Sequence, residues 1–312
     1  MKLAAGTLLA LCMPFCFGCR NAPAAPHAAH ATPRLLPGAI AFWDDRRGLA
    51  LFGPPATTSE RRQDALAATS DGGRTWHRLG SVPGGSRVVV AGSSRAWVLT
   101  RDGLLRSDDR GKAWRRISRY PLSEVSFATA RRGLGYGTRS GHELVATTTD
   151  GGRSWLRLRF PCRDDGGADA DDAVSLGAPN AAWLICVSEP GAGSQRKWLY
   201  RSKDGGRRWR LRSRGGGGYF AGFSFRGERG WLWERRGSFL RTDDGGRTWS
   251  PLPIGKPERV EAESASFYST AGGLALLHDV RTRSVLRLVQ TADGGRSWRE
   301  VRSWPVRTWP AL

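Results

Sequence analysis

The sequence is poor in several residue types, and each shortage narrows the class of protein. Its 312 residues include only two Met, five Tyr, five His and five Cys. So few Cys exclude a disulfide scaffold, and 41 Gly with no triplet period exclude a collagen-like chain. Acidic residues are also scarce: 28 Asp and Glu stand against 49 Lys and Arg, a formal net charge of +21, which excludes an acidic tail. With 39% hydrophobic residues and 14 Trp, the chain can still build a large core.

Long apolar runs are absent after the first twenty residues. Residues 1–19 combine Lys2 with an apolar stretch, which predicts a signal peptide. Cys16-Phe17-Gly18-Cys19 resembles a bacterial lipoprotein cleavage box, and this resemblance implies lipidation of Cys19. Because Cys16 and Phe17 depart from the usual pattern, cleavage by an ordinary signal peptidase stays open. Either way we expect export, as a periplasmic or outer-membrane lipoprotein or as a secreted protein.

Residues 20–37 are rich in Ala and Pro and predict an extended tether. Beyond it only Cys162 and Cys186 remain, an even pair that either forms a disulfide or stays as two buried thiols. An acidic insert at 163–173 is either a Ca²⁺ ligand cluster or an ordinary surface loop. The oxygens of the insert would come from Asp164, Asp165, Asp169, Asp171 and Asp172. Its spacing matches no known loop, so we expect no metal and no cofactor.

The body of the chain repeats the pattern Ser/Thr-x-Asp-x-Gly-x-x-Trp six times. The six Trp are 38, 41, 54, 40 and 49 residues apart, which is the length of a four-stranded unit. The Asp can accept backbone N–H groups and the Gly can adopt a positive φ, so each copy predicts a hairpin turn, with its Trp between neighbouring units. We therefore expect structural roles for Asp71, Asp109, Asp150, Asp204, Asp244 and Asp293, and for Trp76, Trp114, Trp155, Trp209, Trp249 and Trp298.

Two further apolar strands precede each hairpin, so each repeat holds four strands. Repeated four-stranded sheets predict an all-β, six-bladed β-propeller over residues 38–302. A seventh blade could lie in the 54-residue interval. Residues 303–312, with Trp304 and Trp309, either pair with the first blade to close the ring or form a frayed terminus.

The repeats resemble the Asp boxes of BNR-type β-propellers over residues 38–301. The strand spacing is most similar to photosystem II stability/assembly factor-like proteins and related bacterial exported repeat proteins. Sialidases, sortilin-type receptors and xyloglucan-hydrolysing endoglucanases share the box. The resemblance implies a fold with structural boxes at its rim, and it does not assign a function.

Strand alternation puts the turns between second and third strands on the face opposite the boxes, where propellers usually bind ligands. Arg is present in each of these turns, which favours a non-enzymatic binding or assembly scaffold for an envelope protein or an anionic polymer. The candidate binding residues are Arg61, Arg62, Arg101, Arg139, Arg235, Arg236, Arg281 and Arg283. We expect membrane contact only through the N-terminal anchor. We expect no nucleic-acid partner, because the chain is exported and its 44 Arg against 5 Lys point to coding bias.

The alternative is a carbohydrate-active hydrolase, sialidase-like or another glycosidase. A sialidase needs three convergent Arg and a Tyr nucleophile paired with Glu, and none of the five Tyr lies beside a Glu in an obvious site context. Another glycosidase would need two carboxylates as its catalytic acids. In the alternative interpretation, the carboxylates of these loops are ordinary solvated charges. The candidates are Asp102, Glu143, Glu189, Glu234 and Asp279.

Overall fold

The structure, a computed structural model, describes residues 35–54, 63–162, 172–235, 238–254, 260–279, 281–282 and 284–306. They belong to the second of two units, Arg34–Leu312. The elements of this unit are β-strands, and none of the described segments forms a helix that could span a membrane. The predicted signal peptide with Cys19, and most of the predicted tether, lie outside the described residues.

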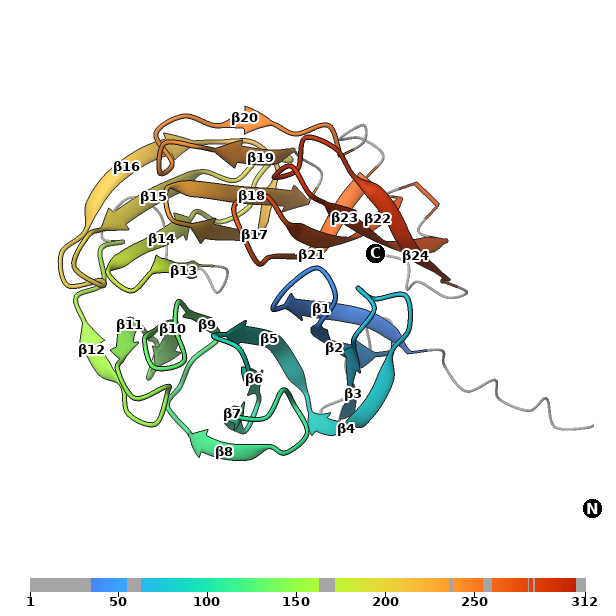
Figure 1. Ribbon diagram of the computed structural model, residues 1–312. Helices are drawn as coiled ribbons and strands as arrows, with labels where there is room; N and C mark the ends of the chain where they lie inside the picture. Colours follow the sequence, from blue (N-terminus) through green and yellow to red (C-terminus); the bar gives the residue numbers. More distant parts are fainter. Residues whose placement is uncertain are drawn as a thin grey trace, which may run out of the picture. The chain divides into compact units, whose positions relative to one another are not determined.

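The strands form six antiparallel sheets, each made of four consecutive strands, arranged as a six-bladed β-propeller (Figure 1). This confirms the predicted fold class. The blades are numbered along the chain. Blade 1 holds β1 (Leu36–Phe42), β2 (Gly48–Gly53), β3 (Gln63–Thr69) and β4 (His77–Pro83); blade 2 holds β5 (Gly85–Ala91), β6 (Arg95–Thr100), β7 (Gly103–Ser107) and β8 (Arg115–Ser118); blade 3 holds β9 (Glu124–Phe127), β10 (Gly133–Arg139), β11 (His142–Thr148) and β12 (Leu156–Leu158). Blade 4 holds β13 (Ala173–Ala178), β14 (Ala181–Val187), β15 (Lys197–Ser202) and β16 (Arg210–Gly215); blade 5 holds β17 (Tyr219–Arg226), β18 (Arg229–Arg235), β19 (Phe239–Thr242) and β20 (Ser250–Pro251); blade 6 holds β21 (Val260–Phe267), β22 (Gly273–Asp279), β23 (Val285–Thr291) and β24 (Arg299–Pro305).

Each Asp box closes the turn between the third and fourth strands of its blade with the same bonds. In the first box, Thr69 Oγ1 donates to Asp71 Oδ1 (2.8 Å) and accepts from Gly73 N (2.9 Å). Asp71 Oδ1 also accepts from Thr75 N (2.9 Å). Gly73 has a φ of 92°, a conformation that L-residues with a Cβ rarely adopt. The same three bonds recur in the other five boxes.

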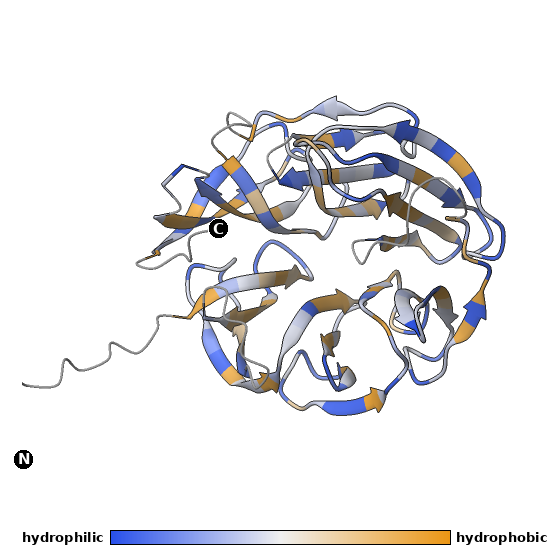
Figure 2. Ribbon diagram, turned by 180° about the vertical axis from the view of Figure 1, so that it is seen from behind, coloured by the Kyte–Doolittle hydropathy of each residue, from blue (hydrophilic) through white to orange (hydrophobic). Residues whose placement is uncertain are grey.

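The hydrophobic core lies between the blades, in six clusters. Hydrophobic residues follow the strands inside the ring, whereas the outermost strands carry many hydrophilic residues (Figure 2). The Trp of each box packs in the cluster between its own blade and the preceding one. Trp76 of blade 1, for example, packs on the cluster that contains Leu274 and Leu288 of blade 6. The box indoles therefore fill the spaces between neighbouring blades.

At three interfaces, the third residue of a blade's second strand is a Trp that reaches the next blade. These Trp are buried and stack on a Phe of the next blade, and each indole N–H donates to a box Gly carbonyl of that blade. The stacked pairs are Trp97–Phe127, Trp183–Phe225 and Trp231–Phe267, with ring centroids 3.7, 4.1 and 3.7 Å apart.

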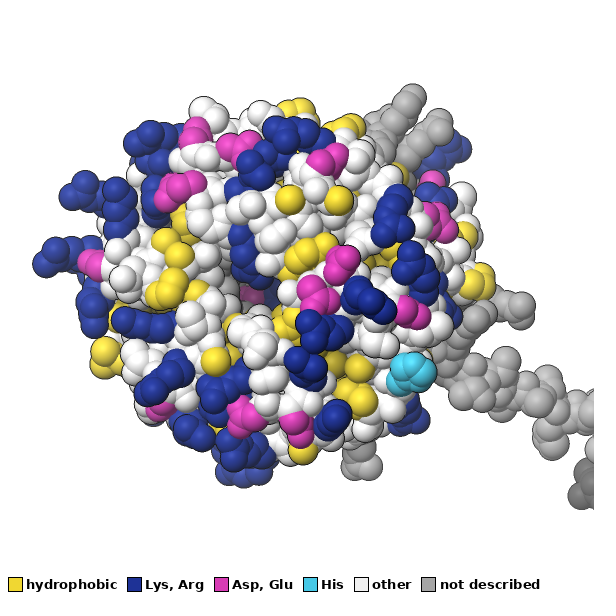
Figure 3. Space-filling view, in the orientation of Figure 1, with side chains coloured by type: hydrophobic (Ala, Val, Ile, Leu, Met, Phe, Trp, Pro, Cys, Tyr) yellow, Lys and Arg dark blue, Asp and Glu magenta, His cyan; other side chains and the backbone are white. Residues whose placement is uncertain are grey.

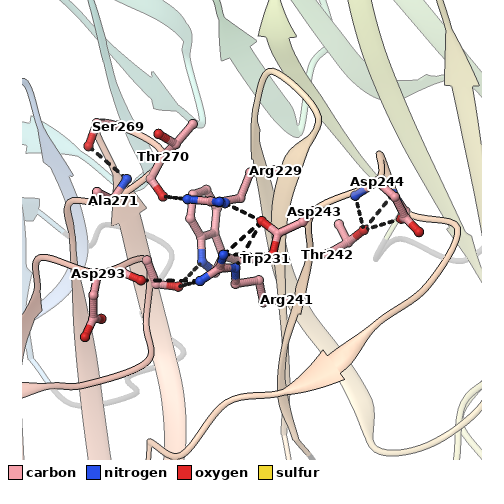
Figure 4. A network of polar contacts seen from close by, with 12 residues as sticks. Arg229, Trp231, Arg241, Thr242, Asp243, Asp244, Ser269, Thr270, Ala271 and Asp293 are labelled. Atoms are coloured by element: carbon pink, nitrogen blue, oxygen red, sulfur yellow. Dashed lines mark hydrogen bonds and ion pairs between the residues drawn. The ribbon is translucent and has the colours of Figure 1, made fainter.

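Buried Arg residues reinforce the same interfaces (Figure 4). Arg241 of β19 donates to both carboxylate oxygens of Asp243 (2.9 and 2.8 Å) and to the carbonyls of Asp293 and Gly294 in the next blade (3.3 Å each). Trp231 donates to the same Gly294 carbonyl (3.0 Å). Part of the large Arg content of the chain is therefore structural.

Side chains, rather than a shared strand, join blade 6 to blade 1. Ile40 N and Phe42 N of β1 donate to the hydroxyls of Ser264 and Ser266 in β21 (3.3 and 2.9 Å). Trp304 packs on Phe52 of blade 1, although its backbone pairs with β23 inside blade 6. The predicted tail at residues 303–312 therefore needs a correction, because residues 303–305 complete β24. Trp309 lies outside the described residues, and the propeller begins with β1 at residue 36, two residues before the predicted start at 38.

A disulfide joins Cys162 and Cys186, whose Cα atoms are 6.0 Å apart. It fixes the connection between blades 3 and 4 to β14. Asp172 lies beside it and accepts a hydrogen bond from Val187 N (2.8 Å). Because the two sulfurs bond to each other, they do not form a metal site with Asp172. The other acidic residues of the insert lie outside the described residues.

Candidate functional site

The propeller has two faces that differ in their loops. In every blade an N–H at the tip of the Asp box donates to a carbonyl in the turn between the first and second strands, as from Gly72 to Arg46 (2.7 Å) and from Gly151 to Arg131 (2.9 Å). These two kinds of turn therefore share one side, which we name the box face. The turns between second and third strands lie on the opposite face.

The predicted binding residues within the described part of the chain occupy the opposite face. Arg101, Arg139, Arg235 and Arg281 are exposed and belong to four different blades. Among the described residues, no hydrogen bond or ion pair joins any two of them, and none of them lines the three cavities of about 90, 210 and 460 Å³ that the described residues enclose. Arg61, Arg62, Arg236 and Arg283 lie outside the described residues. A binding role for this set stays a prediction.

Two of the candidate catalytic carboxylates bind buried side chains and so have structural partners. Glu143 accepts a hydrogen bond from the Tyr136 hydroxyl (2.9 Å), a Tyr–Glu pair that the linear sequence did not reveal. However, Tyr136 is 1% exposed, and burial, together with the charges of Asp172 and Glu143, raises the pKa of its phenol. A nucleophile needs the opposite shift. Glu234 is buried in an ion pair with Lys197 Nζ (2.8 Å).

The remaining candidate carboxylates also lack a paired arrangement. Asp102 and Glu189 are exposed loop residues. Asp279 Oδ1 accepts the N–H groups of Arg281 and Thr282 (2.9 Å each), and so stabilises its own turn. None of the three cavities is lined by two carboxylates. The pair of acids that glycoside hydrolysis requires is thus not found in them.

A groove of about 460 Å³ lies at the rim of the box face, between the Asp boxes of blades 4 and 5. We name it the basic groove. Lys and Arg side chains are spread over the whole face drawn in Figure 3, so their presence alone marks no site. In the groove, however, six of eight lining residues are basic. The lining is Arg201, Lys203, Asp204, Arg208, Arg210, Leu211, Arg212 and Arg247.

The basic side chains of the groove are only partly neutralised. Arg201 pairs with Glu228, and Arg212 donates to the carbonyls of Asp244 (2.7 Å) and Gly245 (3.2 Å) in blade 5. Burial lowers the pKa of Arg212, and the positive charges of Arg247 and Arg201 lower it further. The other four cations, Lys203, Arg208, Arg210 and Arg247, are exposed and form no ion pair with any described residue. The groove therefore offers an uncompensated positive charge to an anion.

Arg208 distinguishes the blade 4 box from the four boxes that carry a hydroxyl at this position and from the blade 2 box, which has Ala113. At the same position Thr75, Ser154, Thr248 and Ser297 donate a hydroxyl to the box Asp (2.6, 2.6, 2.7 and 2.6 Å). Arg208 replaces that hydroxyl, although its backbone N–H still donates to Asp204 (2.9 Å). This N–H is the main cause of a lowered Asp204 pKa, so the box carboxylate stays ionised. The box keeps its turn and adds a charge to the groove.

Solved structures of other proteins share this architecture. The structure "YCF48 bound to D1 peptide" is 16% identical to this chain, with a TM-score of 0.50 over 85% of this chain and 98% of that one. YCF48 from Cyanidioschyzon merolae is also 16% identical, with a TM-score of 0.51 over 85% of both chains. The chain shares its fold with YCF48. The predicted resemblance to photosystem II assembly factors is confirmed at this level.

The fold is also found in proteins of other kinds. The acylaminoacyl peptidase of Pyrococcus horikoshii has a TM-score of 0.55 at 11% identity, over 86% of this chain and 46% of the peptidase. No protein-family model and no curated protein matches the sequence. Likeness at these identities shows the fold alone, so the function must be argued from the site.

The sequence prediction missed the basic groove because it assigned the box residues to structure alone. The groove combines residues from two blades that lie up to 46 positions apart, from Arg201 to Arg247. One sequence signal was available: aligning the six boxes shows that only the blade 4 copy carries a basic residue at the seventh position.

Proposed function

We propose that the protein is an exported, non-enzymatic binding scaffold of the cell envelope, which holds an acidic segment of a partner protein in the basic groove. The observation that carries this proposal is the convergence of six basic residues on one groove with a single Asp among them. Exposed Arg groups match carboxylates in shape and charge, and complementary charge speeds encounter and selects the partner. A protein of the same fold, YCF48, has been solved with a bound peptide. The N-terminal signal motif supports export, and Cys19 would supply a lipid anchor.

The test compares two charge-matched double variants of the whole protein. Arg208→Ser with Arg247→Ser removes two free charges from the groove, and the new serine restores the residue type found in the boxes of blades 3 and 6. Arg101→Ser with Arg139→Ser removes the same charge from the opposite face. Binding is measured by fluorescence anisotropy with a labelled Glu-rich peptide and with its Gln-substituted counterpart.

We expect the groove variant to weaken binding of the Glu-rich peptide by about tenfold, since two partly exposed ion pairs are lost. The opposite-face variant should change the dissociation constant less than about twofold. Added salt should weaken wild-type binding, and the Gln peptide should not bind. Equal losses in both variants would mean that net charge, and not the groove, attracts the peptide. A sulfated polysaccharide that outcompetes the peptide only in the wild type would instead identify an anionic polymer as the partner.

A further inference from the structure

The six innermost strands surround a narrow channel with a wider pocket at its box-face mouth. The channel cavity measures about 90 Å³ and the mouth pocket about 210 Å³. The pocket is lined by residues at or next to the ends of all six inner strands, and it shares Val90, Phe127 and Arg226 with the channel. At about 30 Å³ per water molecule, the pocket could hold about seven waters or one small organic molecule.

Apolar and aromatic residues make up most of the residues that line the mouth pocket, although polar atoms supply most of its exposed surface. Phe42 and Trp43 come from blade 1, Phe127 from blade 3, Leu176 from blade 4 and Tyr268 from blade 6. The indole N–H of Trp43 is buried and has no hydrogen-bond acceptor among the described residues. The aromatic rings can contact a compact apolar body, while the polar atoms of the wall can bind a polar group of the same ligand.

Arg226 is the single charged residue among those that line the mouth pocket. Its guanidinium makes one hydrogen bond within the described part of the chain, from Nη1 to the carbonyl of the adjacent Phe225 (3.1 Å), and it has no acidic partner there. The bond from Gly227 N to Gly177 O (3.2 Å) holds the turn of Arg226 against blade 4. Burial lowers the pKa of Arg226, yet a guanidinium stays charged in proteins. Because Arg226 is only partly exposed and lacks an acidic partner among the described residues, its charge carries a desolvation cost that an anion would offset.

The other two charged residues that line the channel neutralise each other. Arg87 and Glu124 lie on neighbouring inner strands, β5 and β9, and form an ion pair with each other. The channel therefore carries one net positive charge, at Arg226, from the charged groups that line it. A monoanion would neutralise this charge, whereas a dianionic phosphate would leave one negative charge without a counter-ion among the lining residues.

We propose that the mouth pocket binds a carboxylate attached to a small apolar or aromatic body, with Arg226 as its counter-ion. The planar guanidinium can donate two parallel hydrogen bonds to the carboxylate, and the aromatic wall takes the apolar part. The carboxylate could belong to a free small molecule or to the terminus of a peptide chain. This site is separate from the basic groove and does not depend on the function proposed for it.

The test uses benzoate as the probe and benzamide, of the same shape without charge, as its control. Binding to the whole protein is followed by the shift of the Trp43 indole N–H signal in NMR spectra, assigned with Trp43→Phe. Benzoate should shift this signal with saturation and benzamide should not. Arg226→Gln should weaken benzoate binding at least about tenfold, whereas Arg247→Gln in the basic groove should leave it unchanged. No shift up to about 10 mM benzoate, or an equal shift in Arg226→Gln, would overturn the proposal.

A stability measurement separates a ligand site from a structural role of Arg226. Because no acidic group among the described residues pairs with Arg226, Arg226→Gln should leave the melting temperature unchanged or raise it. Arg87→Gln should lower it, since Glu124 would lose its partner. A melting temperature for Arg226→Gln that falls as far as that of Arg87→Gln would make Arg226 a structural residue and overturn the proposal. Tripeptides ending in Phe, with a free or an amidated terminus, identify the source: preference for the free terminus over benzoate assigns a chain end, and preference for benzoate assigns a free molecule.

Discussion

At the residue scale, a small-to-large pairing explains why four blades have a Gly as the first or second residue of their second strand. Gly48 lies opposite Phe42, and a Cβ at Gly48 would come within 2.6 Å of the Phe42 ring. Blades 3, 5 and 6 repeat the pair as Gly133–Phe127, Gly230–Phe225 and Gly273–Phe267. Blades 2 and 4 lack the Phe, and there Val90–Ala96 and Leu176–Ala182 take its place. The Gly is therefore required by the ring opposite it and not by the turn.

This pairing predicts non-additive effects of substitution. Gly48→Ala should destabilise the protein by about 1–3 kcal/mol, because the new methyl group displaces the Phe42 ring. Phe42→Val should also destabilise it, through lost packing against Trp76. The double variant recreates the Val–Ala pair of blade 2. Its loss of stability should therefore be smaller than the sum of the losses in the two single variants. Chemical denaturation of the four proteins measures the coupling, and Gly80→Ala, with no atom near its Cβ, is the control. Strict additivity would contradict this account.

At the element scale, local signals were predictable from the sequence and contacts between blades were not. The box turns depend on residues within eight positions, so Thr69, Asp71 and Gly73 reveal them directly. The stack of Trp97 on Phe127 joins residues thirty positions apart in different blades, and the basic groove joins blades 4 and 5. Such sites depend on which side chains two neighbouring sheets bring together. That depends on the register and packing of both sheets, and neither appears in any single repeat.

The connection between blades 3 and 4 supplies an element-scale prediction. The disulfide closes a loop with a sequence separation of 24, between Cys162 and Cys186. Replacing both residues with Ala should lower the free energy of unfolding by about 2–4 kcal/mol, because the unfolded chain regains loop entropy. A reductant should lower the melting temperature of the wild type and leave that of the double variant unchanged. If the reductant shifted both proteins equally, the loss would not come from the disulfide.

At the scale of the whole molecule, stability should decline on both sides of a maximum in mildly acidic solution. Burial disfavours ionisation of Asp71 and Asp150, but hydrogen bonds from the box hydroxyls and N–H groups outweigh it and lower the pKa of each to about 2. These values lie below the ordinary 3.8, so the boxes stabilise the fold above about pH 4 and lose that effect as the pH falls toward 2. The pKa values of the other four box Asp are also lowered.

The alkaline side depends on a buried cluster in blade 6. Burial opposes the charge of His278, but Glu261 Oε2 (3.0 Å from Nε2) and Glu263 Oε1 (2.9 Å from Nδ1) outweigh it and raise the pKa of His278 to about 9. Because this pKa exceeds the ordinary 6.5, the contribution of protonated His278 to the free energy of unfolding is complete below pH 6.5. It disappears as the pH rises through 9. The loss should reach at most about 3 kcal/mol, which confines maximal stability to between about pH 4 and 6.5.

Two variants separate the two sides of this stability profile, with the free energy of unfolding measured by denaturant from pH 2 to 9. His278→Gln should flatten the decline between pH 6.5 and 9 and leave the acid side unchanged. Asp150→Asn should lower stability at pH 6 and reduce the steepness of the acid decline, because one carboxylate of six no longer titrates. Asp150 and His278 lie in different blades, more than fifty positions apart in the sequence, and share no partner among the described contacts. The combined variant should therefore change the stability by the sum of the two single effects. A wild-type stability that rose from pH 6.5 to 9 would show that His278 is not held protonated by its two glutamates.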